Sequence, residues 1–174
     1  MTAKLAHCHP SDDELGKIYA ADLPLQATPN AVAAALSNVS LKSDDGRRDW
    51  VAAAKAAYDA SYCVKPQPGS LDMGDVMAHI RDVIPDDAII TNGAGNFAIW
   101  PNKFLKFGPK SRLLAPQSGA MGYGVPAAIA AKAHDPKRFV LCFAGDGDFQ
   151  MNGNELGSAM QAGLQPVILI VNNG

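Results

Sequence analysis

The chain has 174 residues, a length that suits one domain of ordinary size. Hydrophobic residues make up 48% of it and charged residues 18%, so the chain has enough apolar side chains for a core, and disorder is not expected. The formal net charge of −2 gives no electrostatic reason to propose nucleic acid or an anionic membrane surface as a partner. No apolar run approaches the ~18 residues that would span a membrane.

The cysteines and the N-terminal residues indicate a compartment. Cys8, Cys63 and Cys142 are odd in number and scattered along the chain. The N-terminal residues lack the apolar segment of a secretory signal peptide. Both features favour a reducing, cytoplasmic location.

The first 41 residues contain short strand-like stretches and two helix-start patterns. Leu5–His9 and Leu23–Ala27 are predicted strands. A polar residue followed three positions later by glutamate predicts a capping box and a short helix over Ser11–Tyr19. Thr28 and Pro29 predict the N-cap and first turn of a second helix, which runs to Leu36.

A proline-rich linker separates this part from the rest of the chain. A polar turn is expected at Ser43–Arg48, followed by an alanine-rich helix over Asp49–Tyr62. Two prolines and a glycine in Lys65–Ser70 cannot continue a helix. We therefore predict that 42–70 is a helix and linker, and that 71–174 is a separate domain.

Strands and helices alternate in the second half of the chain. Strands are predicted at Ala88–Thr91, Arg112–Ala115, Phe139–Ala144 and Pro166–Val171, and helices at Leu71–Ile84, Phe97–Leu105 and Val125–His134. This alternation predicts an α/β fold with a doubly wound parallel sheet.

The first of these helices, Leu71–Ile84, is amphipathic. Its apolar side is expected to consist of Leu71, Val76, Ile80, Val83 and Ile84.

Three glycine-rich turns follow predicted strands, at 92–96, 118–124 and 145–147. Taken singly, each has the composition of an ordinary loop. At the carboxyl ends of parallel strands, however, they would line one rim together. That rim is where open α/β sheets bind ligands.

The stretch from residue 139 to the end of the chain has the strongest functional pattern. A buried strand stops at the tight turn Gly145–Gly147. A capping box over Asn152–Glu155 predicts a helix that ends near Gln161, and a second strand then leads to Asn172–Asn173. A short right-handed connection makes the two strands parallel, which places Asp146 beside Asn173.

The two side chains predict a metal-bound diphosphate. A carboxylate and an amide are hard oxygen ligands, too few to enclose a metal alone, and they suit Mg²⁺ that is also held by phosphate and water. The helix that begins nearby favours an anion at its N-terminus. Asp146 and Asn173 are therefore candidate metal ligands.

The amino-acid sequences of these segments resemble those of a known family. GDG and NN at this spacing, with GDGDFQMNGNEL at 145–156 and SGAMGYGVPAAIAAK at 118–132, are similar to thiamine-diphosphate-dependent enzymes of the acetolactate synthase / pyruvate decarboxylase family, and in particular to the acetolactate-synthase-like branch. The alternative is an ordinary doubly wound domain with a glycine turn and a chance pair of asparagines.

The resemblance implies roles for individual residues. Asp146 and Asn173 would bind Mg²⁺. Gly145, Gly147 and the backbone of Asp148 would face the diphosphate, with the Asp148 side chain turned away because a carboxylate repels it. Relatives often have Ser or Ala at that position.

Two further turns would also contact the cofactor. Gly119 would offer its carbonyl to the aminopyrimidine, and Met121 would hold the cofactor bent. From the residues alone, Met121 is expected to fill the core, as methionine usually does. Gly95 and Asn96 match a turn where relatives often carry Gly-Gln-His to bind phosphate. Phe97 stands here in place of the histidine.

The function that the resemblance implies is part of a thiamine-diphosphate- and Mg²⁺-dependent 2-keto acid decarboxylase or carboligase. The glutamate that activates the cofactor in this family lies on a pyrimidine-binding domain not found here, so no catalytic residue is assigned. A homo-oligomer or a complementing chain would supply that domain. The other possibility is a non-catalytic homologue or fragment that serves as an interaction subunit.

Members of the family have much longer chains. Residues 1–41 resemble the tail of their central domain, which in some relatives binds FAD. Residues 71–174 resemble a diphosphate-binding domain truncated at its C-terminus, and we expect the chain to be inactive alone. The last strand, Val167–Val171, would then have an unpaired edge that is prone to aggregation.

Overall fold

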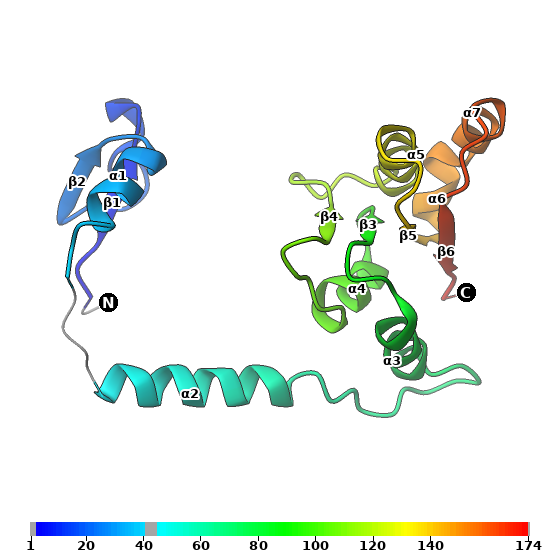
Figure 1. Cartoon of the computed structure of the whole chain (residues 1–174), viewed down its shortest axis with the longest axis horizontal. Coiled ribbons are helices and arrows are strands. Elements are labelled where there is room, and N and C mark those ends of the chain that lie inside the picture. The colour runs from blue at the N-terminus through cyan, green and yellow to red at the C-terminus, as the bar shows by residue number, and fades with distance from the viewer. Residues whose placement is uncertain (1–2, 41–44, 174) are drawn as a thin grey trace. The chain divides into compact units, whose positions relative to one another are not determined.

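In a computed structural model the chain forms two compact units, one up to Ala53 and one from Ala54 onward (Figure 1). The structure describes residues 3–40 and 45–173. The predicted linker Lys65–Ser70 contains no helix or strand. The functional boundaries at residues 41 and 70 stay predictions.

The smaller unit is built on two parallel strands. These are β1 (Ala6–His9) and β2 (Leu23–Gln26), and Cys8 pairs with Leu25. Helix α1 (Pro29–Leu36) follows, and the Thr28 hydroxyl accepts a hydrogen bond from the amide of Ala31 at 3.2 Å. The predicted strands, helix and N-cap are therefore confirmed.

The predicted helix over Ser11–Tyr19 is wrong. The structure has a three-residue 3-10 helix, η1 (Asp12–Glu14), and the Ser11 side chain makes no capping hydrogen bond. Gly16 has φ +79°, a left-handed conformation that stops helical propagation.

Helix α2 (Asp45–Ala60) begins earlier than predicted. The expected turn at Ser43–Arg48 is wrong for Gly46–Arg48, which lie inside the helix, and Ser43 lies outside the described residues. A helical glycine costs about 1 kcal/mol relative to alanine. The alanine-rich sequence that follows extends the helix in spite of this cost.

The larger unit is a four-stranded parallel sheet with strand order β4-β3-β5-β6. Its strands are β3 (Ile89–Asn92), β4 (Arg112–Leu114), β5 (Val140–Gly145) and β6 (Val167–Val171). Each lies within one residue of its predicted limits. The α/β prediction with a parallel sheet is confirmed.

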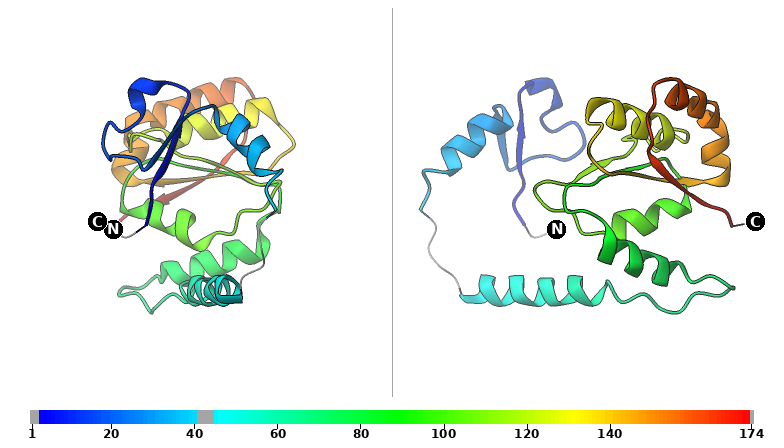
Figure 2. Two further views of the ribbon diagram at one scale, coloured as in Figure 1. Left: turned by 90° about the vertical axis from the view of Figure 1, so that its left-hand side faces the viewer. Right: turned by 45° about the vertical axis from the view of Figure 1, so that its right-hand side comes forward.

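Helices cover both faces of this sheet (Figure 2). The longer ones are α3 (Met73–Val83), α5 (Gly124–His134), α6 (Asp146–Asn152), α4 (Ile99–Phe104) and α7 (Leu156–Gln161), with 3-10 turns η2 (Asn96–Ala98) and η3 (Gly153–Glu155). Helices α3 and α4 lie on one face, and α5 lies on the other.

The alternation of side chains along β3 and β5 builds two hydrophobic cores. Ile90, Leu141 and Phe143 face α3 and α4, where Met77 and Phe104 are also buried. On the opposite face, residues of the same two strands pack with α5; these residues are Ile89, Val140, Cys142, Ala144, Val125 and Ala128. Strands buried on both faces are typical of parallel sheets.

The buried face of α3 differs from the predicted one. Leu71 and Val83 are exposed, and Met77 is completely buried. The difference arises because Asp72 caps the helix and accepts a hydrogen bond from the amide of Gly74 at 2.7 Å. Leu71 therefore lies before the helix, and the residues that pack against the sheet are Met73, Met77, Ile80 and Ile84.

The segment after β5 also differs from its prediction. Helix α6 begins at Asp146, so 146–147 form a first helical turn rather than a tight turn before a later helix. The predicted capping box at Asn152–Glu155 is wrong, because the Asn152 side chain makes no capping hydrogen bond. Its amide instead donates to the carbonyl of Gly122 at 2.7 Å.

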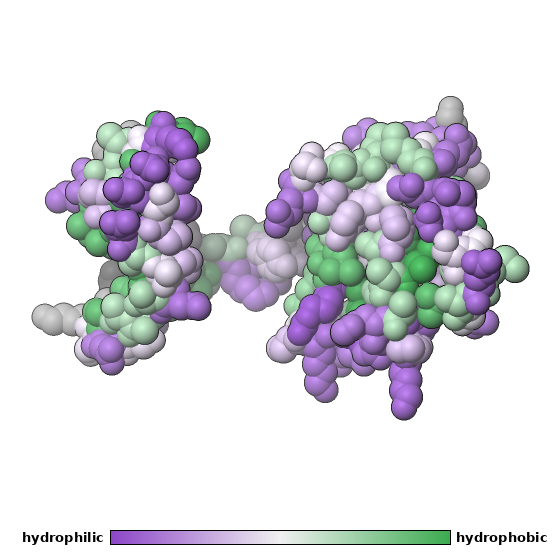
Figure 3. Space-filling model, turned by 90° about the horizontal axis from the view of Figure 1, so that it is seen from above, coloured by the Kyte–Doolittle hydropathy of each residue, from purple (hydrophilic) through white to green (hydrophobic). Residues whose placement is uncertain are grey.

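The surface of the larger unit carries hydrophobic residues among hydrophilic ones (Figure 3). Its exposed large hydrophobic side chains include Met121, Tyr123, Met151, Leu156 and Met160. Within 3–40 and 45–173, no helix has both the length and the apolar character of a membrane span.

Candidate functional site

Three of the four strands of the sheet lead at their carboxyl ends into the predicted glycine turns. The turn at 92–96 follows β3, the turn at 118–124 follows β4, and α6 starts directly after β5. Because the strands are parallel, these three segments and Asn172–Asn173 lie at one edge of the sheet. The rim predicted from the sequence is therefore present.

The turn after β3 is held by buried polar side chains. Asn92 is 2% exposed, its amide donates to the carbonyl of Gly93, and its carbonyl oxygen accepts from Asn102 at 3.3 Å. Thr91, also buried, donates to the carbonyl of Gly124 at 2.8 Å. The Asn92 bonds thus hold the turn to itself and to α4, and the Thr91 bond joins the end of β3 to the start of α5.

Gly95 and Asn96 are exposed at this turn, whereas Phe97 is buried. A Cβ atom at Gly145 would lie 2.9 Å from the Phe97 ring, so the ring packs against the backbone at the end of β5. Phe97 is part of the hydrophobic core that α3 and α4 cover. Its side chain is therefore not placed to contact an anion at the rim.

The carboxylate of Asp148 joins the three turns. One of its oxygens, Oδ1, accepts hydrogen bonds from the amide of Gly122 at 2.7 Å and from the amide of Ala94 at 3.3 Å. Asp148 is 2% exposed, and its second oxygen has no hydrogen-bond partner. The side chain is thus buried between the turns that line the rim.

The turn after β4 presents a methionine to the start of α6. Gly122 has φ +81° and is bonded through its amide to Asp148 and through its carbonyl to Asn152. Met121 is 45% exposed, so it does not fill the core. Its Cε atom lies 3.8 Å from the position of a Cβ at Gly147. Gly119, with φ +68°, is exposed beside it.

The two candidate metal ligands lie at the ends of paired strands. Gly145 pairs with Val171, Asp146 follows directly, and Asn173 follows two residues later. Asp146, Gly147 and Asn173 are all exposed. No group of three or more His, Cys, Asp or Glu side chains within 3–40 and 45–173 is arranged to hold a metal. A cation at this edge would need ligands from a bound molecule.

The Cys142 thiol lies in β5, three residues before the strand ends at this edge. Cys142 is completely buried in β5. The pKa of the Cys142 thiol is raised to about 11, mainly by burial and to a smaller extent by the nearby Asp148 carboxylate, while a hydrogen bond with Thr91 lowers it. The thiol is therefore neutral and unreactive near pH 7.

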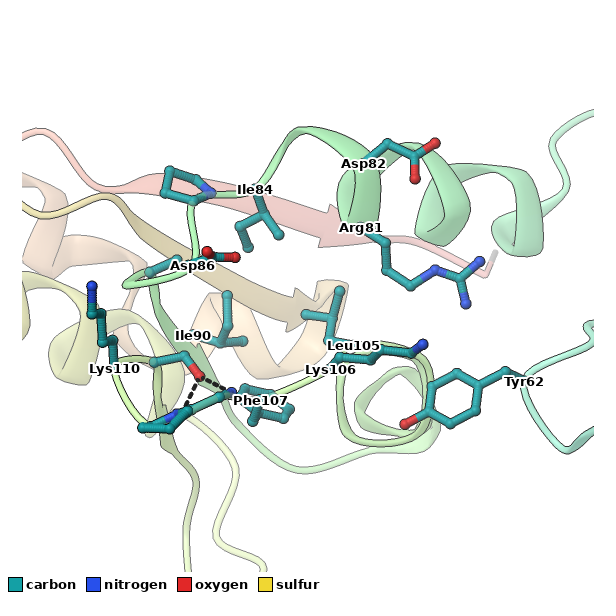
Figure 4. A pocket seen from close by; sticks show the side chains of 15 residues that line it. Tyr62, Arg81, Asp82, Ile84, Asp86, Ile90, Leu105, Lys106, Phe107 and Lys110 are labelled. Carbon is teal, nitrogen blue, oxygen red and sulfur yellow. Dashed lines mark hydrogen bonds between the residues drawn. The ribbon is translucent and has the colours of Figure 1, made fainter. Parts of the chain in front are cut away.

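A cavity of about 850 Å³ lies elsewhere in the larger unit (Figure 4). Its lining includes Ile84, Asp86 and Ala88, which lead into β3, and Lys110 and Ser111, which lead into β4. It therefore opens at the amino ends of the strands. None of the candidate site residues lines it, and we do not assign the site to it.

Sequence reasoning missed the contacts that hold the turns together. Asn152 reads as a capping residue but bonds to Gly122, which is 30 residues away. The Thr91 bond to Gly124 spans 33 residues. The one available signal was a carboxylate at position 148 next to a predicted anion site, which indicated that the side chain would turn away from the diphosphate.

Comparison with known proteins shows which family the larger unit resembles. Residues 93–174 match the family described as "Thiamine pyrophosphate enzyme, C-terminal TPP binding domain". The chain is 31% identical over 174 residues to the acetolactate synthase large subunit of Parasynechococcus marenigrum, 33% over 180 residues to that of Corynebacterium glutamicum, and 31% over 173 residues to acetolactate synthase isozyme 1 large subunit of Escherichia coli.

These alignments cover nearly all of this chain and a minor part of each relative. They include 98% of this chain and 28% of the Parasynechococcus protein, 99% and 28% for the Corynebacterium protein, and 98% and 30% for the Escherichia protein. The chain thus spans less than a third of the length of the curated relatives it matches.

Proposed function

Because residues 93–174 belong to the thiamine pyrophosphate enzyme family, we propose that this chain is the cofactor-binding part of a larger enzyme. That enzyme would depend on thiamine diphosphate and Mg²⁺, be similar to acetolactate synthase, and act on 2-keto acids. The observation that carries the proposal is the meeting of three glycine turns with Asp146 and Asn173 at one edge of a parallel sheet. Bound thiamine diphosphate supplies the electron sink for making or breaking a carbon–carbon bond beside a carbonyl.

The donor chemistry of this edge fits a Mg²⁺–diphosphate. Asp146 and Asn173 would each contribute one oxygen, and diphosphate and water would complete the coordination, since Mg²⁺ retains water and favours phosphate oxygens. Gly95 and Asn96, exposed at the end of β3, would complete the phosphate side of the site.

The remaining residues of the rim would bind and orient the cofactor. The amides of Gly145, Gly147 and Asp148 lie at the start of α6, where the first amides of a helix have no partner within the helix, and they would face the diphosphate. Gly119 would accept from the aminopyrimidine. Met121, exposed and close to Gly147, would support the bent cofactor.

Turnover would require further parts of the protein. An activating glutamate would come from a pyrimidine-binding domain elsewhere in the same protein or in a second chain of an oligomer. Residues 1–41 would belong to the central domain, which in some members of the family binds FAD. The free thiols of Cys8, Cys63 and Cys142 support a cytoplasmic location.

Calorimetric titration of the full chain with thiamine diphosphate tests this proposal. We expect binding that requires Mg²⁺ and that weakens about 10-fold or more in Asp146→Ala, because a charged ligand of the metal is lost. Asp75→Ala is the matched control, since Asp75 is also exposed and lies in the first turn of a helix, α3. Equal affinity in the presence and absence of Mg²⁺ would contradict the metal assignment.

A second candidate function is a non-catalytic homologue that serves as an interaction subunit. The buried Phe97, at the position where relatives often have a phosphate-binding histidine, favours it. In that case the same titration would give no heat of binding with or without Mg²⁺, while the folded sheet persists in the circular dichroism spectrum.

A further inference from the structure

A buried carboxylate lies where the three glycine turns meet. Asp148 accepts hydrogen bonds from the backbone amides of Ala94 and Gly122, which lie 54 and 26 residues earlier in the chain and belong to two different turns. Both bond to the same oxygen, Oδ1, and the buried Oδ2 has no partner. A buried polar atom without a hydrogen bond is unfavourable for folding. This arrangement therefore calls for an explanation beyond simple packing.

Gly93 lies directly against this carboxylate. A Cβ atom at Gly93 would be 1.9 Å from Oδ1 and 2.4 Å from both Cγ and Oδ2 of Asp148. These separations are far below the contact distance of non-bonded atoms. The Asp148 side chain in its present position and any side chain at residue 93 therefore exclude each other.

We propose that Asp148 is a positioning residue, which holds the turns at 92–96 and 118–124 at the separation that the cofactor site requires. One oxygen atom bonded to both Ala94 and Gly122 prevents the two turns from moving apart independently. Asn96 and Met121 lie within two residues of these anchor points in the sequence, and the Cε atom of Met121 lies 3.8 Å from the position of a Cβ at Gly147. The step from held turns to cofactor affinity rests on the proposed function, because preformed geometry strengthens binding only where a ligand uses it.

A purely stabilising carboxylate would look similar, and the chain provides one for comparison. Asp72 also accepts two backbone amides, from Gly74 at 2.7 Å and from Gln67 at 3.0 Å. It lies at the start of α3 and touches none of the three turns. Loss of Asp72 should lower stability without affecting the site.

The first experiment compares Asp148→Ala, Asp148→Asn and Asp72→Ala in the full chain. Calorimetry gives the affinity for thiamine diphosphate with Mg²⁺, and NMR hydrogen exchange gives the protection of the Ala94 and Gly122 amides. We expect Asp148→Ala to lose about 10-fold or more in affinity and to exchange both amides about 10-fold faster. Asp148→Asn keeps an oxygen acceptor and should stay within about 3-fold of the unmodified chain on both measures.

Asp72→Ala should leave both measures unchanged while lowering the melting temperature. Unchanged affinity and unchanged amide exchange in Asp148→Ala would overturn the proposal. Equal losses of affinity in Asp148→Ala and Asp72→Ala would also overturn it, because they would indicate a general effect of stability.

A second experiment tests the exclusion of a side chain at residue 93, and it remains informative if Asp148→Ala is unstable. Gly93→Ala should be strongly destabilised, and addition of Asp148→Ala should restore part of the lost stability, because the three nearest atoms are removed. Additive effects of the two substitutions would contradict the pairing of Gly93 with Asp148.

The outcomes separate this inference from the proposed function. If the unmodified chain binds no thiamine diphosphate but Asp148→Ala still loses protection at Ala94 and Gly122, the proposed function fails and the positioning of the turns stands. If the unmodified chain binds the cofactor and Asp148→Ala binds it equally well, the proposed function stands and the positioning role fails.

Discussion

Both units of the chain pair their strands in parallel, but they differ in burial. In the larger unit every residue of β3 and β5 is buried, and two cores cover both faces of the sheet. In the smaller unit no residue among 3–40 and 46–53 is buried, and Leu23 of β2 is 53% exposed. The contrast indicates that parallel pairing alone does not make a core.

The physical reason lies in the covering helices. Apolar burial contributes about 25 cal/mol per Å² removed from water, whereas a hydrogen bond largely exchanges one partner for another. Helices α3, α4 and α5 provide that burial for β3 and β5. Helix α1, which follows β2, contributes no buried residue of its own. A two-stranded pair without such cover is marginal in water.

The largest expected effect of this difference is on amide exchange. The amides of β3 and β5 should exchange through global unfolding, with protection on the order of 10⁴ or more, whereas those of β1 and β2 should exchange through local opening with little protection. Hydrogen exchange resolved by residue measures both. Comparable protection of β1 and β5 would break the comparison.

The next effect is the cost of truncating one side chain in each unit. Phe143 in β5 is completely buried, so Phe143→Ala should lower the free energy of unfolding by about 3–5 kcal/mol. Leu25 in β2 is only half-buried, and Leu25→Ala should cost less than about 1 kcal/mol. Urea unfolding of the two variants gives both values, and similar losses would contradict the proposed contrast.

The buried thiol of the larger unit predicts a pH dependence. The pKa of Cys142 is raised from 9.0 to about 11 in the folded chain, so the folded state retains its proton where the unfolded state has lost it. This contribution is complete below pH 9 and disappears between about pH 9 and 11, where stability should fall by up to about 2–3 kcal/mol.

Urea unfolding at several pH values, compared with Cys142→Ala, isolates this effect. In the variant, the free energy of unfolding should lack the part of the fall with rising pH that comes from Cys142. Tyr62 does not obscure the comparison, because a hydrogen bond with Tyr58 raises its pKa to about 12, and both proteins retain this pair. An identical slope in the two proteins would show that Cys142 is not the titrating group.

The smallest effect concerns one helix cap in each unit. Asp72→Ala and Thr28→Ala each remove the side-chain acceptor that caps a helix. Each substitution should lower the stability of its helix by about 1 kcal/mol. For Asp72 the loss should appear in global unfolding, because α3 packs on the core. For Thr28 it should appear only as faster exchange in α1. A lower global stability in Thr28→Ala would show that the units unfold together.

The strands of the larger unit were predictable because apolar runs of strand length end in glycine turns. The run at Phe139–Ala144 became β5, shifted by one residue. The capping boxes failed for a different reason. Ser11 and Asn152 have a pattern that describes only four neighbouring residues, and a partner distant in sequence, the carbonyl of Gly122, outcompetes the local one for Asn152.

The sequence by itself determined where turns and possible ligands follow the strands, since glycine favours tight turns and the side chains of aspartate and asparagine carry oxygen ligands. It thereby indicated Asp146, Asn173 and the three glycine turns. Only the tertiary structure decided that Asp148 bonds to Ala94 and Gly122 and excludes a side chain at Gly93. Such contacts depend on which strands become neighbours in the sheet, and that order is set by packing of the whole unit rather than by any local pattern.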